Sequence, residues 1–185
     1  MPAQVQRSKL KHAQAIERLK RGDRVDVKIE PLCIFLTRDG TVITLSRGRS
    51  LEFTAPIRDR LRHADTGLRN SADASMLVQA VLDLLVDRVF EVVDEYHARI
   101  LAVEHAVLMR PRMKHVRDLH ILQADLSQHK RTLEPVKTVA YGLRRYDVDR
   151  TVALIPDEER DPTKPVKGFM SHKSKIYLAD VVSWA

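Results

Sequence analysis

The sequence predicts a mainly helical α+β fold, in which a small β-hairpin or sheet remnant accompanies a long antiparallel helical hairpin. Aromatic residues make up only 5% of the 185 residues, so the core must be built from Leu, Val, Ile and Ala. Such a composition favours layers of helices over a sandwich of aromatic-rich strands. Apolar side chains also recur at helical spacing through 74–109 and through 114–145, on either side of Pro111.

Residues 1–70 are expected to form a partial α/β region. Apolar positions three and four apart predict a basic helix over 5–21. A second basic helix is predicted over 56–69, where Pro56 suits the first helical turn.

Between these two helices the pattern predicts a β-hairpin over 25–46. Apolar and charged residues alternate at its start, and Asp39-Gly40 is among the strongest short-range signals for a hairpin turn. Cys33 lies in an apolar run and is expected to be buried as a small hydrophobic side chain. Because an isolated hairpin is only marginally stable, we expect this one to pack on helices or on further strands.

Residues 71–145 are expected to form the long helical hairpin. The first helix, 74–109, would be about 54 Å long at about 1.5 Å per residue, and Pro111 ends it. The second helix, 114–145, has a heptad-like apolar repeat, which predicts a continuous seam against the first helix. The seam positions are Leu119, Leu122, Leu126, His129, Leu133, Val136, Ala140 and Leu143.

Residues 146–172 carry Asp, Pro and Gly at short intervals, which predicts a linker without regular structure. The last segment, 173–185, is predicted to begin another helix. The chain contains no run of about 18 apolar residues, so no segment of it is expected to span a membrane.

One face of the first long helix carries three carboxylates. At 100° per residue, Asp83, Asp87 and Asp94 all lie opposite the apolar stripe. Two interpretations are open: a solvated polar face, or a surface of oxygen ligands for a hard cation such as Mg²⁺. One face of one helix cannot complete a coordination shell, so the second interpretation requires ligands from a partner subunit.

The net charge and the motifs of the sequence limit the classes of function that are possible. The net charge of +7 suits nucleic acid, an anionic membrane surface or simple solubility. No helix-turn-helix, zinc-finger or aromatic-interleaved motif accompanies the basic residues, so nucleic-acid binding is not favoured. The sequence has no Gly-rich phosphate loop, no GxSxG elbow and no His pair at zinc-ligand spacing. We therefore expect neither an enzyme nor an organic cofactor.

Several segments together resemble a known family. The chain is similar to the cytosolic domain of CorA-type magnesium transporters, especially their fungal branch. The resemblance covers roughly 25–181, and it is specific in combination. The segments that carry it are Leu32–Ile43, Leu68–Asp83, Arg110-Pro111, Arg131–Val136 and Tyr177–Val181.

The resemblance implies a homopentamer in which each subunit has an α/β cytosolic domain, a helical hairpin, a stalk helix and two membrane helices joined by a Gly-Met-Asn motif. In that family, cytosolic Mg²⁺ bound between subunits keeps the channel closed. By resemblance, Asp83 is the hairpin-helix carboxylate of this regulatory site and Asp180 is the stalk-helix carboxylate. Asp87 is a weaker candidate.

This chain contains neither the Gly-Met-Asn motif nor a membrane helix. We therefore expect a fragment, on the cytosolic face of a membrane in the parent protein and cytoplasmic by itself, that cannot conduct ions alone. Two alternatives from other classes are a helical-hairpin interaction module without an ion role, and a basic nucleic-acid adaptor.

Overall fold

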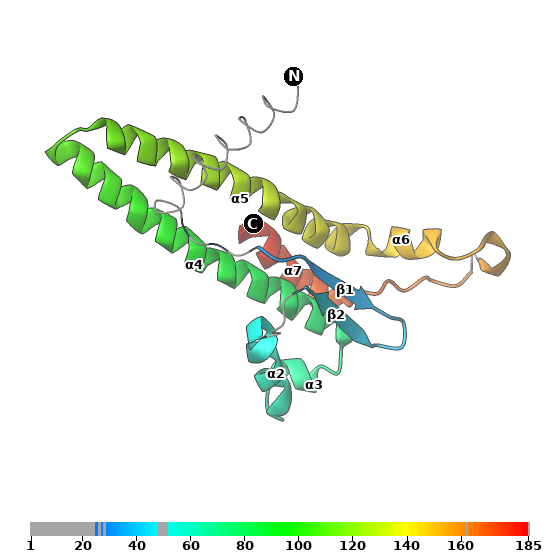
Figure 1. Ribbon diagram of the computed structural model, residues 1–185. Coiled ribbons are helices and arrows are strands. Elements are labelled where there is room, and N and C mark those ends of the chain that lie inside the picture. Colours follow the sequence, from blue (N-terminus) through cyan, green and yellow to red (C-terminus); the bar gives the residue numbers. More distant parts are fainter. Residues whose placement is uncertain (1–24, 26, 28, 48–51, 162, 185) are drawn as a thin grey trace, which may run out of the picture. The chain divides into compact units, whose positions relative to one another are not determined.

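The computed structural model describes residues 25, 27, 29–47, 52–161 and 163–184 (Figure 1). The basic helix expected over 5–21 lies outside them. The chain divides into two compact units: unit 1 comprises 1–27 and 90–132, and unit 2 comprises 28–89 and 133–185. The mainly helical α+β class is confirmed, with a two-stranded antiparallel sheet and long helices.

The sheet of unit 2 consists of β1 (Leu32–Leu36) and β2 (Val42–Ser46). The predicted turn joins them, and Gly40 adopts a φ of 86°, which a residue with a side chain rarely tolerates. The strands are shorter than the predicted hairpin over 25–46: the described residues before β1 are not in a strand. Pro31 explains this boundary, because it has no N–H to donate to a ladder.

The two faces of this sheet differ in burial. Leu32, Ile34 and Leu36 are half-buried and contact the hydrophobic clusters of unit 2. The alternate residues of both strands are exposed, and the register pairs Cys33 with Leu45. The expectation of a buried Cys33 was therefore wrong, because strand alternation places it on the outer face.

The predicted helix over 56–69 is interrupted. A 3₁₀ turn (η1, Glu52–Thr54) leads into α2 (Ala55–Arg62), and α3 (Gly67–Asn70) follows after a break. At the break the Thr66 hydroxyl donates to the carbonyl of His63 at 3.0 Å. Side-chain bonding of this kind competes with helical hydrogen bonds. The Ile57 side chain is buried and packs against Ala80 and Val81.

Two long helices pass through both units: α4 (Ala74–Met109) and α5 (Met113–Arg145). The first has the predicted bounds, and the second begins one residue early. Within unit 2 the first turns of α4 are buried on nearly every side, because one side packs against Ile57 and the other against α5 and α7. The buried residues there are Ser75, Met76, Val78, Gln79, Ala80, Val81 and Leu82.

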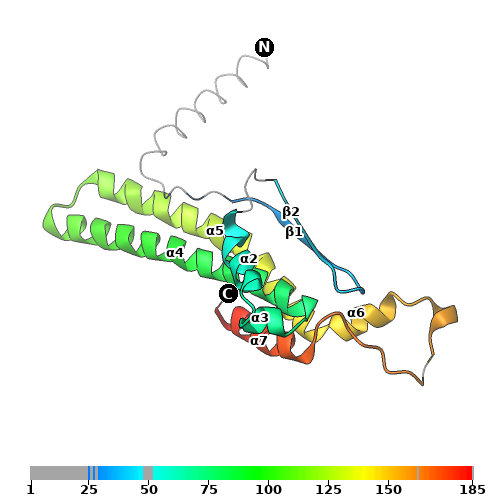
Figure 2. The same cartoon turned by 90° about the horizontal axis from the view of Figure 1, so that it is seen from below.

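Residues 146–172 are not the unstructured linker that we expected. They contain α6 (Asp147–Ala153) and a 3₁₀ turn, η2 (Asp157–Glu159). Tertiary contacts of the Asp147 carboxylate with Phe169, Met170 and Lys175 stabilise this helix despite its sequence. The last helix, α7 (His172–Trp184), packs beside α4 and α5 within unit 2 (Figures 1 and 2). Leu178 and Val181 of α7 share one buried cluster with Leu82 and Ala140.

Unit 1 contains the end of the hairpin, where α4 and α5 are joined by 110–112. Among the described residues of this unit, the buried side chains are Tyr96, Ile121, Leu122 and Asp125. The ring of Tyr96 meets the ring of His129 edge-on, with 5.6 Å between centroids. The seam of unit 1 therefore includes His129, one of the predicted seam positions, which contacts Tyr96 of α4.

Two predicted seam positions, Leu119 and Leu126, are exposed, at 43% and 38%. An α-helix has 3.6 residues per turn, so a strict seven-residue repeat drifts around a straight helix. The contact line consequently follows Leu122, Asp125 and His129 in unit 1.

The exposure of Leu126 predicts that a charge at this position is tolerated better than a change at a buried seam position. Leu126→Asp is expected to lower the free energy of unfolding by less than about 2 kcal/mol, because the side chain is already 38% exposed and the new carboxylate can meet water. The matched control Leu122→Ala, at a buried position one turn earlier, should cost about 2 kcal/mol or more. Urea denaturation of both variants measures the difference. A larger loss in Leu126→Asp than in Leu122→Ala would contradict the observed seam.

Candidate metal centre

Three of the four candidate aspartates lie in unit 2. Asp83 is half-buried on α4, Asp87 is exposed one turn further along, and Asp180 is exposed on α7. Asp94 belongs to unit 1 and is exposed. The acidic face predicted on α4 is therefore divided, and only its first part lies in the same unit as α7.

Asp83 has an electrostatically unfavourable environment. Burial raises the pKa of its carboxyl group, and the neighbouring carboxylate of Asp87 raises it further. The Arg60 guanidinium on α2 acts in the opposite direction, whereas Asp180 contributes a further upward shift. The structure thus brings Asp83 and Asp180 of one chain within electrostatic reach of each other.

The sequence pattern did not indicate the role of Arg60. It lies in a basic helix predicted from 56 to 69, but nothing in that pattern pointed to Asp83 as its neighbour. The contact of Ile57 with Ala80 and Val81 turns α2 toward the acidic side of α4. Arg60 is a monovalent counter-charge, and it does not cancel the effect of burial and the two other carboxylates, because the net shift of the pKa remains upward.

This arrangement fits a hydrated cation better than a fully coordinated one. Among the described residues, no three or more His, Cys, Asp and Glu side chains lie close enough to hold a metal ion together. Mg²⁺ retains several of its waters and usually binds through one or two carboxylates. A half-buried carboxylate beside two others has the oxygen chemistry and the excess negative charge that such an ion would offset.

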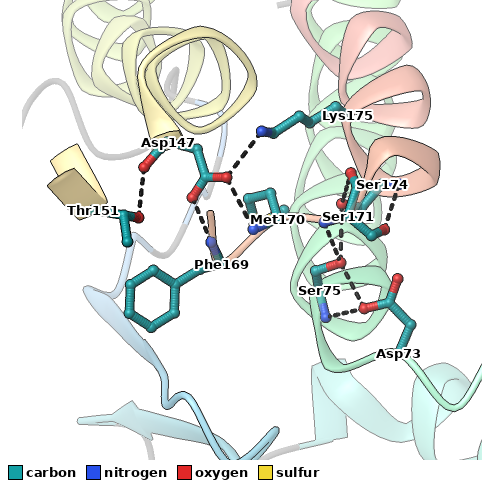
Figure 3. Close-up of polar contacts among 9 residues, drawn as sticks. All are labelled: Asp73, Ser75, Asp147, Thr151, Phe169, Met170, Ser171, Ser174 and Lys175. Atoms are coloured by element: carbon teal, nitrogen blue, oxygen red, sulfur yellow. Dashed lines mark hydrogen bonds and ion pairs between the residues drawn. The ribbon is translucent and has the colours of Figure 1, made fainter. Parts of the chain in front are cut away.

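The position of Asp180 depends on how α7 is held, and a buried carboxylate holds its N-terminal end (Figure 3). Asp147, at the start of α6, accepts hydrogen bonds from the N–H groups of Phe169 (2.9 Å) and Met170 (3.1 Å). Its carboxylate also pairs with Lys175 Nζ of α7 at 2.9 Å. A Cβ at Gly168 would collide with this carboxylate, so a residue without a side chain is required there.

A second polar cluster joins the beginning of α7 to the beginning of α4 (Figure 3). The buried Ser75 Oγ lies 2.6 Å from Asp73 Oδ1 and 3.0 Å from Ser174 Oγ, and it accepts the N–H of Ser171 at 3.0 Å. Burial acts to raise the pKa of Asp73, but hydrogen bonds from Ser171 and Ser75 hold it below its ordinary value. Since Ser174 meets Ser75 and Asp180 acts on Asp83, α7 follows α4 in the same direction.

The sequence did not single out these anchoring residues. Its pattern puts Asp147 in a linker and gives Ser75 no role beyond the start of a helix. The sequence does contain Asp147 and Gly168 within one polar segment. Nothing in the sequence shows that the two are in contact, however, so the pair could be interpreted only once the fold was known.

Comparison with known proteins places these features in a family. The family model described as CorA-like Mg²⁺ transporter protein matches residues 18–159, which include Asp83 and Asp87 but not Asp180. The cobalt/magnesium transport protein CorA of Thermotoga maritima is 30% identical over 90 residues. That stretch is 49% of this chain and 25% of the relative, so the chain matches about a quarter of the relative's length. In the part of the chain that the structure describes, no helix combines the length and apolarity needed to cross a bilayer.

Proposed function

The chain belongs to the CorA-like Mg²⁺ transporter family, and we propose that it is a regulatory, cytosolic part of a divalent-cation transporter. We propose that Asp83 and Asp180 sense the cation, with Asp87 contributing charge. The single observation that supports this proposal is the half-buried Asp83, whose pKa is raised by burial, Asp87 and Asp180 together. The negative charge at this site is not fully compensated by the neighbouring residues, so binding of a cation there would be favourable.

These residues would act by changing how stably α7 packs against α4. The carboxylates of Asp87 and Asp180 each repel that of Asp83, and Arg60 offsets only part of this repulsion. A hydrated Mg²⁺ supplies the missing positive charge when bound. Without it, the repulsion between Asp83 and Asp180 opposes the packing of α7, whereas the contacts of Asp147 and Ser75 favour it. The balance between the two makes the position of α7 sensitive to the cation.

We further propose that copies of the chain associate, as a pentamer in the complete transporter. Support comes from α7, which leaves Ile176 and Tyr177 exposed in the single chain. A neighbouring copy that covers this face would also be placed to add ligands near Asp180, which lies one turn after Ile176 on the same face of the helix.

Mg²⁺ is expected to raise the melting temperature of the chain, and Asp83→Asn is expected to abolish that increase. Without Mg²⁺ at neutral pH, Asp83→Asn should melt no lower than the unmodified chain. The reason is the sign of the shift: a folded-state pKa above the unfolded value of 3.8 means that the charged form of Asp83 destabilises the fold. The penalty is present above the folded-state pKa and disappears as the pH falls toward 3.8.

Differential scanning fluorimetry across a Mg²⁺ titration measures this. Asp94→Asn is the matched control, because it removes an exposed carboxylate of the same helix in the other unit. An equal Mg²⁺ response in Asp83→Asn and in Asp94→Asn would refute the sensing role. That outcome would favour a helical-hairpin interaction module without an ion role.

A further inference from the structure

The end of the helical hairpin in unit 1 is both apolar and basic. Leu108 and Met113 are among the most exposed large hydrophobic side chains described, at 84% and 82%. Met109 and Val116 are also well exposed. We call the segment 105–117 the hairpin tip. Large apolar side chains that are exposed together and flanked by polar residues are typical of a surface that binds a protein or a membrane.

The charges of the hairpin tip are all of one sign. Residues 105–117 contain no Asp or Glu, whereas Arg110, Arg112 and Lys114 are exposed between the apolar side chains. The acidic residues of the hairpin lie further back on both helices, beginning with Glu104 on one side and Asp118 on the other. The tip therefore has a positive local charge, and its cations alternate with its apolar side chains.

We propose that the hairpin tip docks on an anionic lipid surface. Alternation of exposed Leu and Met with Arg and Lys is the chemistry of an interfacial anchor, in which apolar side chains enter the boundary of the acyl chains and the cations meet the headgroups. The methylene chains of the Arg and Lys residues can also lie against the inserted apolar side chains, while their charged groups stay at the membrane surface.

The shape of the tip favours a lipid surface over a protein groove. The connection between α4 and α5 is only 110–112, so Leu108 and Met113 stand at the convex end of a helical pair. A convex end with exposed apolar side chains can insert into a lipid bilayer, because the bilayer adapts to its shape. A protein partner would need a concave groove of matching shape. This inference is independent of the proposed cation site, because it uses unit 1 alone.

Vesicle co-sedimentation of the full chain tests the proposal. The chain is expected to sediment with mixed phosphatidylserine–phosphatidylcholine vesicles more strongly than with phosphatidylcholine vesicles. The double variant Leu108→Asp/Met113→Asp should lower the partition coefficient at least about tenfold. Arg110→Glu/Arg112→Glu should lower it about fivefold for each cation removed, with a weaker dependence on salt.

Matched controls separate the tip from the general basic charge of the chain. Leu101→Asp replaces an exposed leucine of the same helix, and Lys130→Glu removes an exposed cation of the same unit. Both should retain vesicle binding. If the tip variants and the controls bind alike, the attraction comes from elsewhere in the chain and the proposal fails.

Two further outcomes would also overturn it. One is the absence of any sedimentation with anionic vesicles. The other is self-association that depends on protein concentration, is lost in Leu108→Asp/Met113→Asp and occurs without vesicle binding. That result would assign the hairpin tip to a second copy of the chain.

Discussion

Replacing Asp147 by alanine is expected to lower the free energy of unfolding by about 3–5 kcal/mol, the range seen when one partner of a buried ion pair is removed. The carboxylate of Asp147 is almost fully buried and accepts two backbone N–H groups in addition to Lys175 Nζ. Its loss leaves these donors without their acceptor inside the protein, and desolvated donors without partners are costly. Chemical denaturation followed by circular dichroism measures the change.

A second variant separates the buried charge from the lost contacts. Asp147→Ala/Lys175→Met removes the unpaired ammonium group, so part of the lost stability should return. Gly168→Ala should resemble Asp147→Ala, because the added methyl group displaces the same carboxylate. In the double variant, Gly168→Ala should lower the free energy of unfolding much less than it does alone, because the effects of substitutions at contacting residues are not additive. Full additivity would contradict the contact between Gly168 and Asp147.

Leu178→Ala is expected to lower the free energy of unfolding by about 3 kcal/mol or more. Leu178 is completely buried in the cluster that joins α4, α5 and α7, with Leu82 and Ala140 among its neighbours. Removing its side chain deletes apolar contacts and leaves a cavity, and the combined cost for a buried leucine is about 2–5 kcal/mol. The upper part of this range applies because three helices converge on the site and none can move in freely.

The matched control for Leu178 lies on the same helix. Ile176→Ala removes a side chain that is 56% exposed, and it should change stability by less than about 0.5 kcal/mol. Urea denaturation of the two variants compares them directly. A small effect of Leu178→Ala would mean that α7 does not pack on the hairpin as described. Because α7 carries Asp180, Leu178→Ala should also weaken any response to Mg²⁺.

Much of the fold follows from local chemistry and could therefore be predicted. The bounds of α4, the stop at Pro111 and the turn at Asp39-Gly40 each depend on side chains within a few residues. The common face of Asp83 and Asp87 follows from helical geometry alone. The candidate status of Asp180 came from resemblance, and the metal role of all three remains a proposal.

Other features could not be predicted, because they depend on contacts between distant segments. The α6 helix forms in a segment rich in Asp and Pro, where its first residue meets Phe169 and Lys175. The seam of the hairpin passes through Asp125 and leaves Leu126 exposed. Hydrophobicity indicates that a residue favours burial, but the packing of neighbouring helices decides which face is buried.

Local sequence was sufficient for the long helices, the β-turn and the shared face of the acidic residues, since these depend on backbone preferences and helical periodicity over short distances. Tertiary packing was needed to establish that Arg60 and Asp180 act on Asp83, and that Asp147 secures the start of α7. Electrostatic coupling and buried hydrogen bonds depend on separation in space, and residues from 60 to 180 come within reach of one another only after the helices have packed.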